Sequence, residues 1–61
     1  MTGEEKSQLQ ALSQTLRKEQ AALLLAAARN GALPSNSTIR RVAYLELNIA
    51  AIENTIADPV G

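Results

Sequence analysis

The last third of the chain carries its clearest hydrophobic pattern. Large apolar residues recur there at alternating steps of three and four positions: Val42, Leu45, Ile49, Ile52 and Ile56. This spacing is typical of an apolar seam along a helix that packs against another helix. It predicts a helix over about residues 37–57, which Asp58 and Pro59 would end.

The first half of the chain predicts a longer helix, over about residues 3–30. Thr2 and Glu5 have the spacing of a capping box, and Gly31 suits the left-handed position just past a helix end. Glu19 interrupts the expected apolar stripe, at a position where a charge usually reaches out to water. The other members of that stripe are expected to be Leu9, Leu12, Leu16, Leu23 and Ala26.

Residues 31–36 predict a short connection between these helices. Leu33-Pro34 disfavours continued helix, and the polar residues that follow offer several side chains as helix caps. A short connection makes consecutive helices antiparallel neighbours. The expected fold class is therefore all-α, with residues 1–61 forming a single antiparallel two-helix hairpin.

Apolar residues outside these stripes predict self-association. Residues 21–28 are apolar on every face, and a helix of this kind is normally covered on every face. A 61-residue chain without cysteine also has a marginal core. We therefore expect a homo-oligomer, with a dimeric four-helix bundle favoured over a higher helical oligomer. The expected interface comprises Leu24, Leu25, Tyr44, Leu47 and Ala51.

The composition disfavours catalysis and membrane insertion. The chain has no His and no Cys, so we expect no enzyme activity, no catalytic residue, no cofactor and no bound metal. Its longest apolar run is shorter than the about 20 residues that span a bilayer. No basic segment followed by an apolar core opens the chain, so we expect no secretory signal, no membrane contact and a cytoplasmic location.

One end of the predicted hairpin favours anions. Arg29, Arg40 and Arg41 gather near the turn, whereas most acidic residues gather at the open end. Arg40 and Arg41 would lie in the first turn of the second helix, where the helix dipole disfavours positive charge. Together with the hydroxyls of Ser35 and Ser37, these side chains could hold a phosphate. The alternative is that the arginines are only solvated or pair with nearby acids.

The layout resembles the plasmid RNA modulators, which are hairpins that dimerise into four-helix bundles. That resemblance implies RNA binding through an exposed aromatic residue on the first helix, whose outer face here offers Gln8, Gln14, Arg17 and Lys18 but no aromatic. Zero net charge and a single aromatic residue also disfavour RNA.

A second resemblance is to small phage proteins that sequester the cyclic nucleotides of bacterial anti-phage defence. It covers Leu33-Pro34-Ser35, Leu45-Glu46 and Ala50-Ala51-Ile52. It implies stacking and phosphate contacts, here from Tyr44 and the turn arginines, in place of that family's Thr-Lys and Trp positions, which this sequence lacks.

These patterns predict a small self-associating hairpin that acts as a regulator or inhibitor through protein–protein contacts, of the kind that phages and plasmids encode. The alternative is a binder of phosphate-bearing ligands, either a cyclic nucleotide or RNA. The expected partners are a second copy of the chain and either another protein or a phosphate-bearing small ligand, with RNA the less favoured ligand.

Overall fold

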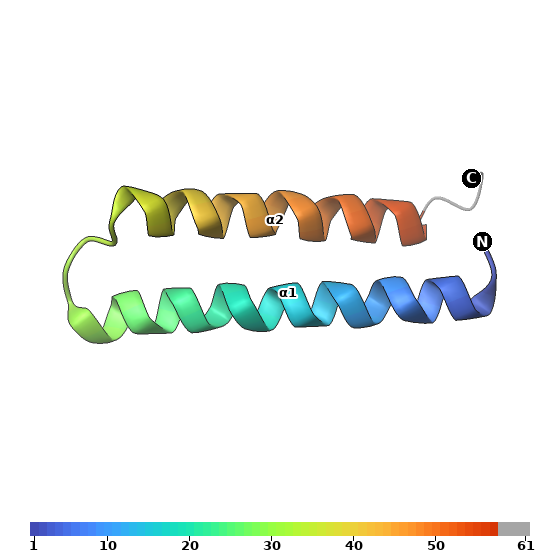
Figure 1. Ribbon diagram of the computed structural model, residues 1–61, viewed down its shortest axis with the longest axis horizontal. Helices are drawn as coiled ribbons and strands as arrows, with labels where there is room; N and C mark the ends of the chain where they lie inside the picture. The colour runs from blue at the N-terminus through green and yellow to red at the C-terminus, as the bar shows by residue number, and fades with distance from the viewer. Residues whose placement is uncertain (58–61) are drawn as a thin grey trace.

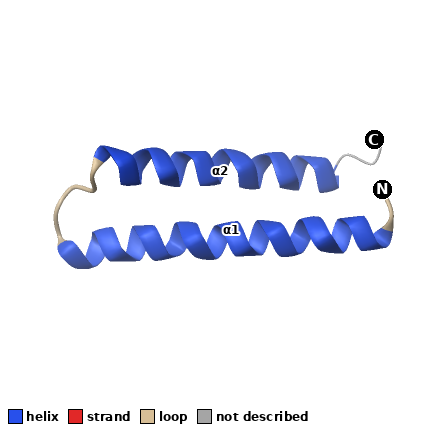
Figure 2. Cartoon of the chain, in the orientation of Figure 1, coloured by secondary structure: helices blue, strands red, loops and turns tan. Residues whose placement is uncertain are grey.

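The computed structural model describes residues 1–57, which form two antiparallel helices (Figure 1). Helix α1 spans Gly3–Asn30 and helix α2 spans Asn36–Ala57, and the other described residues are loop (Figure 2). The pair forms a rod of 44 × 15 × 13 Å, with the N-terminus and the end of α2 opposite the turn. The expected all-α antiparallel hairpin is confirmed. The proposed helix stop at Asp58 and Pro59 lies outside the described residues.

Helix α1 begins and ends with the signals that the sequence predicts. Thr2 Oγ1 accepts a hydrogen bond from the backbone N–H of Glu5 at 3.0 Å, and the Glu5 carboxylate accepts one from the backbone N–H of Thr2 at 2.8 Å. This reciprocal capping box satisfies two amides that a helix start otherwise leaves free. At the other end, Gly31 adopts φ +66° and its N–H donates to the carbonyl of Ala28.

Helix α2 begins at Asn36, one residue earlier than expected, because Ser35 caps it. The Ser35 hydroxyl accepts from the backbone N–H of Thr38 at 3.2 Å. Arg40 and Arg41 are therefore the fifth and sixth residues of α2 and lie in its second turn. The prediction that they oppose the helix dipole within the first turn is wrong, and their conflict with it is weaker because the effect fades within one turn.

The seam of α2 is the core of the hairpin. Ile49 is completely buried, Leu45 and Ile52 are buried, and Val42 and Ile56 are partly buried. These five residues are the ones that the sequence predicts for the seam. Among the described residues, the only buried apolar side chains are these three in the middle of α2.

The seam of α1 differs from the prediction at every second position. Leu12 and Ala26 are exposed, so the expectation that they share the stripe is wrong, whereas Glu19 is exposed as expected for a charge at that position. The residues one position later are the ones that turn toward α2. The six residues of α1 that are not exposed are Leu9, Ser13, Leu16, Gln20, Leu23 and Ala27.

The cost of burying charge explains this choice of face. The alternative stripe would place the Glu19 carboxylate in the seam, and burying a charge costs several kcal/mol unless it is well paired. The structure instead buries the neutral amide of Gln20, which is 7% exposed. Its Nε2 donates to Glu46 Oε1 at 3.0 Å and to the carbonyl of Val42 at 3.3 Å. One buried amide therefore finds two acceptors, and Glu19 stays in water.

A single hairpin leaves much of its surface uncovered. The chain exposes 4707 Å², whereas a compact monomer of 6.5 kDa exposes roughly 3,800 Å². Its radius of gyration of 14.1 Å also exceeds the about 10 Å of a compact domain of this length. The core is thin because two helices can cover only one stripe of each other.

Candidate functional site

The surface exposes more large apolar side chains than the core buries. Leu33 is 95% exposed and Leu47 is 66% exposed, and six others are about half exposed. Scattered apolar residues are normal on a surface, but contiguous ones mark contact sites. The eight described residues in this class are Met1, Leu12, Leu24, Leu25, Leu33, Ile39, Tyr44 and Leu47.

The seam register divides these residues between two flanks of the hairpin. On one side, Arg17 Nη2 and Glu53 Oε1 form an ion pair at 2.9 Å that links the two helices. Leu24 and Ile39 lie on the same side and line one apolar hollow of about 120 Å³ near the turn. We call this side the ion-pair flank; its residues are Gln10, Arg17 and Leu24 of α1 and Ile39, Glu46 and Glu53 of α2.

The opposite side carries the single aromatic residue, Tyr44, which is 59% exposed. An open hollow of about 530 Å³ on this side brings Leu9 and Leu12 of α1 together with Thr55 of α2. We call this side the tyrosine flank. It comprises Glu5, Gln8, Leu12, Thr15, Glu19, Ala22, Ala26 and Arg29 of α1 and Ser37, Arg41, Tyr44, Asn48, Ala51 and Thr55 of α2.

The five residues predicted as an oligomer interface do not share one face. The register places Leu24 on the ion-pair flank, and Tyr44 and Ala51 on the tyrosine flank. Leu25 and Leu47 lie on the outer edges of their helices, away from the seam. No single flat contact can therefore cover all five residues. Sequence reasoning missed Leu12, which it assigned to the seam.

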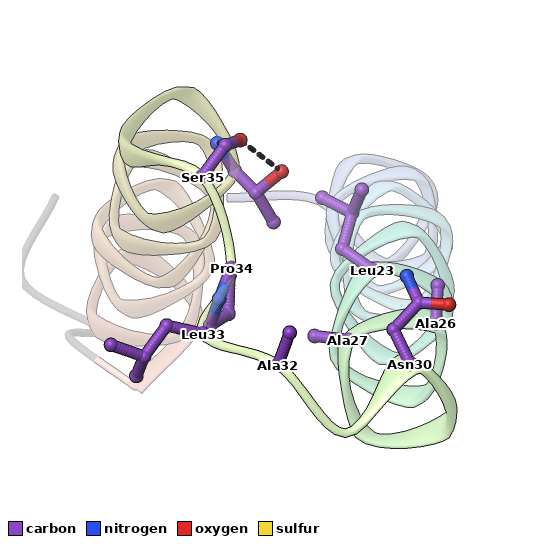
Figure 3. Close-up of a pocket in the computed structure, with 9 residues that line it drawn as sticks. Leu23, Ala26, Ala27, Asn30, Ala32, Leu33, Pro34 and Ser35 are labelled. Atoms are coloured by element: carbon purple, nitrogen blue, oxygen red, sulfur yellow. Dashed lines mark hydrogen bonds between the residues drawn. The ribbon is translucent and has the colours of Figure 1, made fainter.

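A third hollow, of about 300 Å³, lies at the turn (Figure 3). Its wall is mainly apolar, with Leu23 and Ala27 facing Pro34 across it, and the exposed Leu33 is part of its rim. Its polar groups are Asn30, Ser35 and Thr38, and the dashed line marks the 3.0 Å bond from Ser35 Oγ to Thr38 Oγ1. None of the three turn arginines is among the residues that line it.

The residues predicted to bind an anion are only partly brought together. Ser35 and Ser37 are adjacent, since their hydroxyls lie 3.0 Å apart, but Ser35 is already engaged in the helix cap. Arg29 and Arg41 lie toward the tyrosine flank, whereas Arg40 lies on the outer edge of α2. All three arginines are exposed. Within residues 1–57, the only ion pair is the one between Arg17 and Glu53.

Two acidic residues of α2 contact side chains of α1. Glu46 accepts a hydrogen bond from Gln20, and Glu53 pairs with Arg17. The described part of the chain contains no group of three potential metal-binding side chains. Neither described helix has the length and apolar character to cross a bilayer.

Comparison with known proteins gives this chain no relative, because no family model, no curated protein and no solved structure matches it. The features of the molecule that bear on function are therefore the exposed apolar side chains, the two flanks and the distribution of charge.

Proposed function

We propose that this protein is a self-associating helical hairpin that acts as a small regulator or inhibitor through protein–protein contacts. The observation that carries the proposal is the imbalance between core and surface. Within residues 1–57, three apolar side chains are buried, while eight large apolar side chains are about half exposed or more. A second copy of the chain is the partner that this surface fits first.

The energetics favour association. Complete burial of a large apolar side chain contributes about 1.5–3 kcal/mol of favourable free energy. Burying the exposed half of such a side chain against a partner therefore contributes roughly half of that value. A small chain whose core supplies only about 3–5 kcal/mol gains substantially from such contacts. A dimer of two hairpins is a four-helix bundle, the simplest closed arrangement that covers helix flanks.

The surface that a dimer leaves uncovered supports the proposed regulator or inhibitor role. Two hairpins that stack through one flank keep the opposite flank and the outer edges accessible. Leu25 and Leu47, on those edges, then remain available to a further protein. The side chains present also suit binding better than catalysis, because the chain contains neither histidine nor cysteine.

Light scattering across a dilution series tests the self-association. We expect a molar mass of twice the 6.5 kDa of one chain at micromolar concentration, falling toward one chain on dilution. A chain that stays monomeric over that range while its helices melt cooperatively would contradict the proposal. The Leu25→Gln and Leu47→Gln variants provide controls, because a stacked dimer leaves both outer edges in solvent.

A second candidate function is the binding of a phosphate-bearing ligand, such as a cyclic nucleotide, near the turn. The observation that favours it is that residues 20–45 contain Arg29, Arg40 and Arg41 but no acidic residue. Clustered cations attract phosphate, and this attraction weakens steeply as salt rises. A thermal-shift series with cyclic dinucleotides and inorganic phosphate tests it. Binding would raise the melting midpoint, and the Arg29→Gln/Arg41→Gln variant would lose that rise.

A further inference from the structure

The charges of the hairpin are separated along its length. The half that contains the turn, residues 20–45, carries three arginines and no acid. Within the described residues, the open half carries five acids and three cations, so its side chains sum to a charge of minus two. The rod of 44 Å therefore has a positive end and a negative end.

We infer that two copies pair head to tail through their tyrosine flanks, an arrangement that rests on the self-association proposed above. Two hairpins that stack through the same flank can be related by a two-fold axis along the rod or across it. An axis along the rod sets the three arginines of one turn beside those of the other. An axis across the rod sets the positive half of each copy beside the negative half of its partner, which is electrostatically complementary.

The seam register fixes which residues then meet. The midpoint of α1 lies between Leu16 and Arg17, and Gln20 reaches residues on both sides of Leu45, so Leu16 shares a layer with Ile49. A two-fold axis across this midpoint stacks α1 on its own copy and α2 on its own copy. A residue that lies a given distance before the midpoint of its helix then faces the residue that lies the same distance after the midpoint in the second copy of that helix.

The tyrosine flank is complementary to itself under this axis. Tyr44 lies level with the small residues Ala51 and Thr55 of the second copy, so its ring has space between them. Leu12 lies level with Ala22, another large residue against a small one. Aromatic residues in such positions are the usual energetic anchors of an interface.

Charges on the same flank also agree with the head-to-tail arrangement. Arg29, near the end of α1, lies level with the start of the second copy's α1, where Glu5 lies on the same flank. On the ion-pair flank, the same axis would place Arg17 opposite its own copy and Glu46 opposite Glu53. Like charges facing one another disfavour that flank.

The available area requires a full-length contact. A stable interface buries about 800 Å² on each partner. One face of the hairpin is a rectangle of 44 by 15 Å, or about 660 Å² in projection before side-chain relief is counted. A contact over half the length would be too small, so the two-fold axis has to lie near the middle of the rod.

Nitroxide labels on a Leu33→Cys variant test the orientation by pulsed electron spin resonance. Leu33 lies in the turn, its side chain is 95% exposed, and the chain has no other cysteine. The head-to-tail dimer predicts a label-to-label distance close to the 44 Å length of the rod. A distance comparable with the 13–15 Å thickness of the rod, in a sample that light scattering shows to be dimeric, would overturn this inference alone. A monomer in light scattering would overturn the self-association as well.

Matched substitutions test the flank and the charges. We expect Tyr44→Ala to raise the dimer dissociation constant about 30-fold, as for an anchor residue, and Leu47→Ala, on the outer edge, to change it less than about 3-fold. Arg29→Glu should weaken a head-to-tail dimer about 5-fold and less so in high salt. Equal effects of the two alanine variants, or a tighter dimer for Arg29→Glu, would contradict the arrangement. Circular dichroism of each variant serves as the control that it remains helical.

Discussion

The two helices contribute different kinds of side chain to the seam between them. Helix α2 presents large apolar side chains at five successive seam positions and supplies every buried apolar residue of the described chain. Helix α1 alternates leucines with Ser13, Gln20 and Ala27, and none of its apolar residues is buried. The buried apolar side chains of the core therefore belong to α2. Helix α1 contributes the buried polar contact between the two helices, from Gln20 to Val42 and Glu46.

The largest expected effect separates the two seams directly. Ile49→Ala removes a completely buried side chain and should cost about 2–5 kcal/mol. Leu16 lies in the same layer but is partly exposed, so Leu16→Ala should lower the free energy of unfolding by about half as much. Urea unfolding followed by circular dichroism gives both values at one protein concentration. Equal costs for the two variants would mean that the burial difference between the helices has no energetic consequence.

Gln20 sharpens the comparison, because it is the one buried polar side chain in the described residues. Gln20→Ala should cost about 1–2 kcal/mol, since it removes two hydrogen bonds and leaves a gap in the seam. Gln20→Leu should be neutral or stabilising, because the exposed Glu46 recovers its hydration.

The informative readout for Gln20→Leu is the uniqueness of the structure. Loss of the polar contact should allow alternative helix registers, visible as extra amide signals in NMR spectra. A single set of sharp signals, with stability lower than that of Gln20→Ala, would show that the hydrogen bonds stabilise the seam and do not specify it.

The smallest expected effect is at the ion pair between Arg17 and Glu53. Both side chains are more than half exposed, so water and salt screen their attraction. Arg17→Gln should change the unfolding free energy by less than about 0.5 kcal/mol. The exchanged pair, Arg17→Glu with Glu53→Arg, should match the original chain. A loss above about 1 kcal/mol in Arg17→Gln would indicate that the flank contributes as much as the seam.

The sequence predicts α2 better than α1 for a physical reason. In α2, only one set of large apolar residues has the alternating spacing, so the buried face is unambiguous. In α1, Leu9, Leu16 and Leu23 belong to two competing stripes that differ by one position at every second step. Which stripe faces α2 depends on whether burial of Glu19 or of Gln20 costs less free energy. Burial of Gln20 costs less because its amide finds two acceptors on α2.

Helix ends were predictable because capping is local. The groups that cap α1 are close in sequence, since Thr2 bonds to Glu5 and Gly31 bonds to Ala28. Residue spacing alone is therefore enough to predict both ends of this helix. The surface was less predictable, because the faces of exposed residues follow from the seam register. The stripe expected for α1 includes Leu12, which in the structure lies on the tyrosine flank, and the expected interface combines Leu24 and Tyr44, which lie on opposite sides of the hairpin.

Folding and self-association of this hairpin are linked if a second copy covers its exposed flanks. The most direct test is the melting midpoint, by circular dichroism, over a hundred-fold range of protein concentration. If the exposed flanks are covered by a second copy, mass action requires the midpoint to rise with concentration, and Tyr44→Ala should lower it most at the dilute end. A midpoint that stays constant over the whole range, in a cooperative transition, would show that one hairpin is stable alone and would contradict the account.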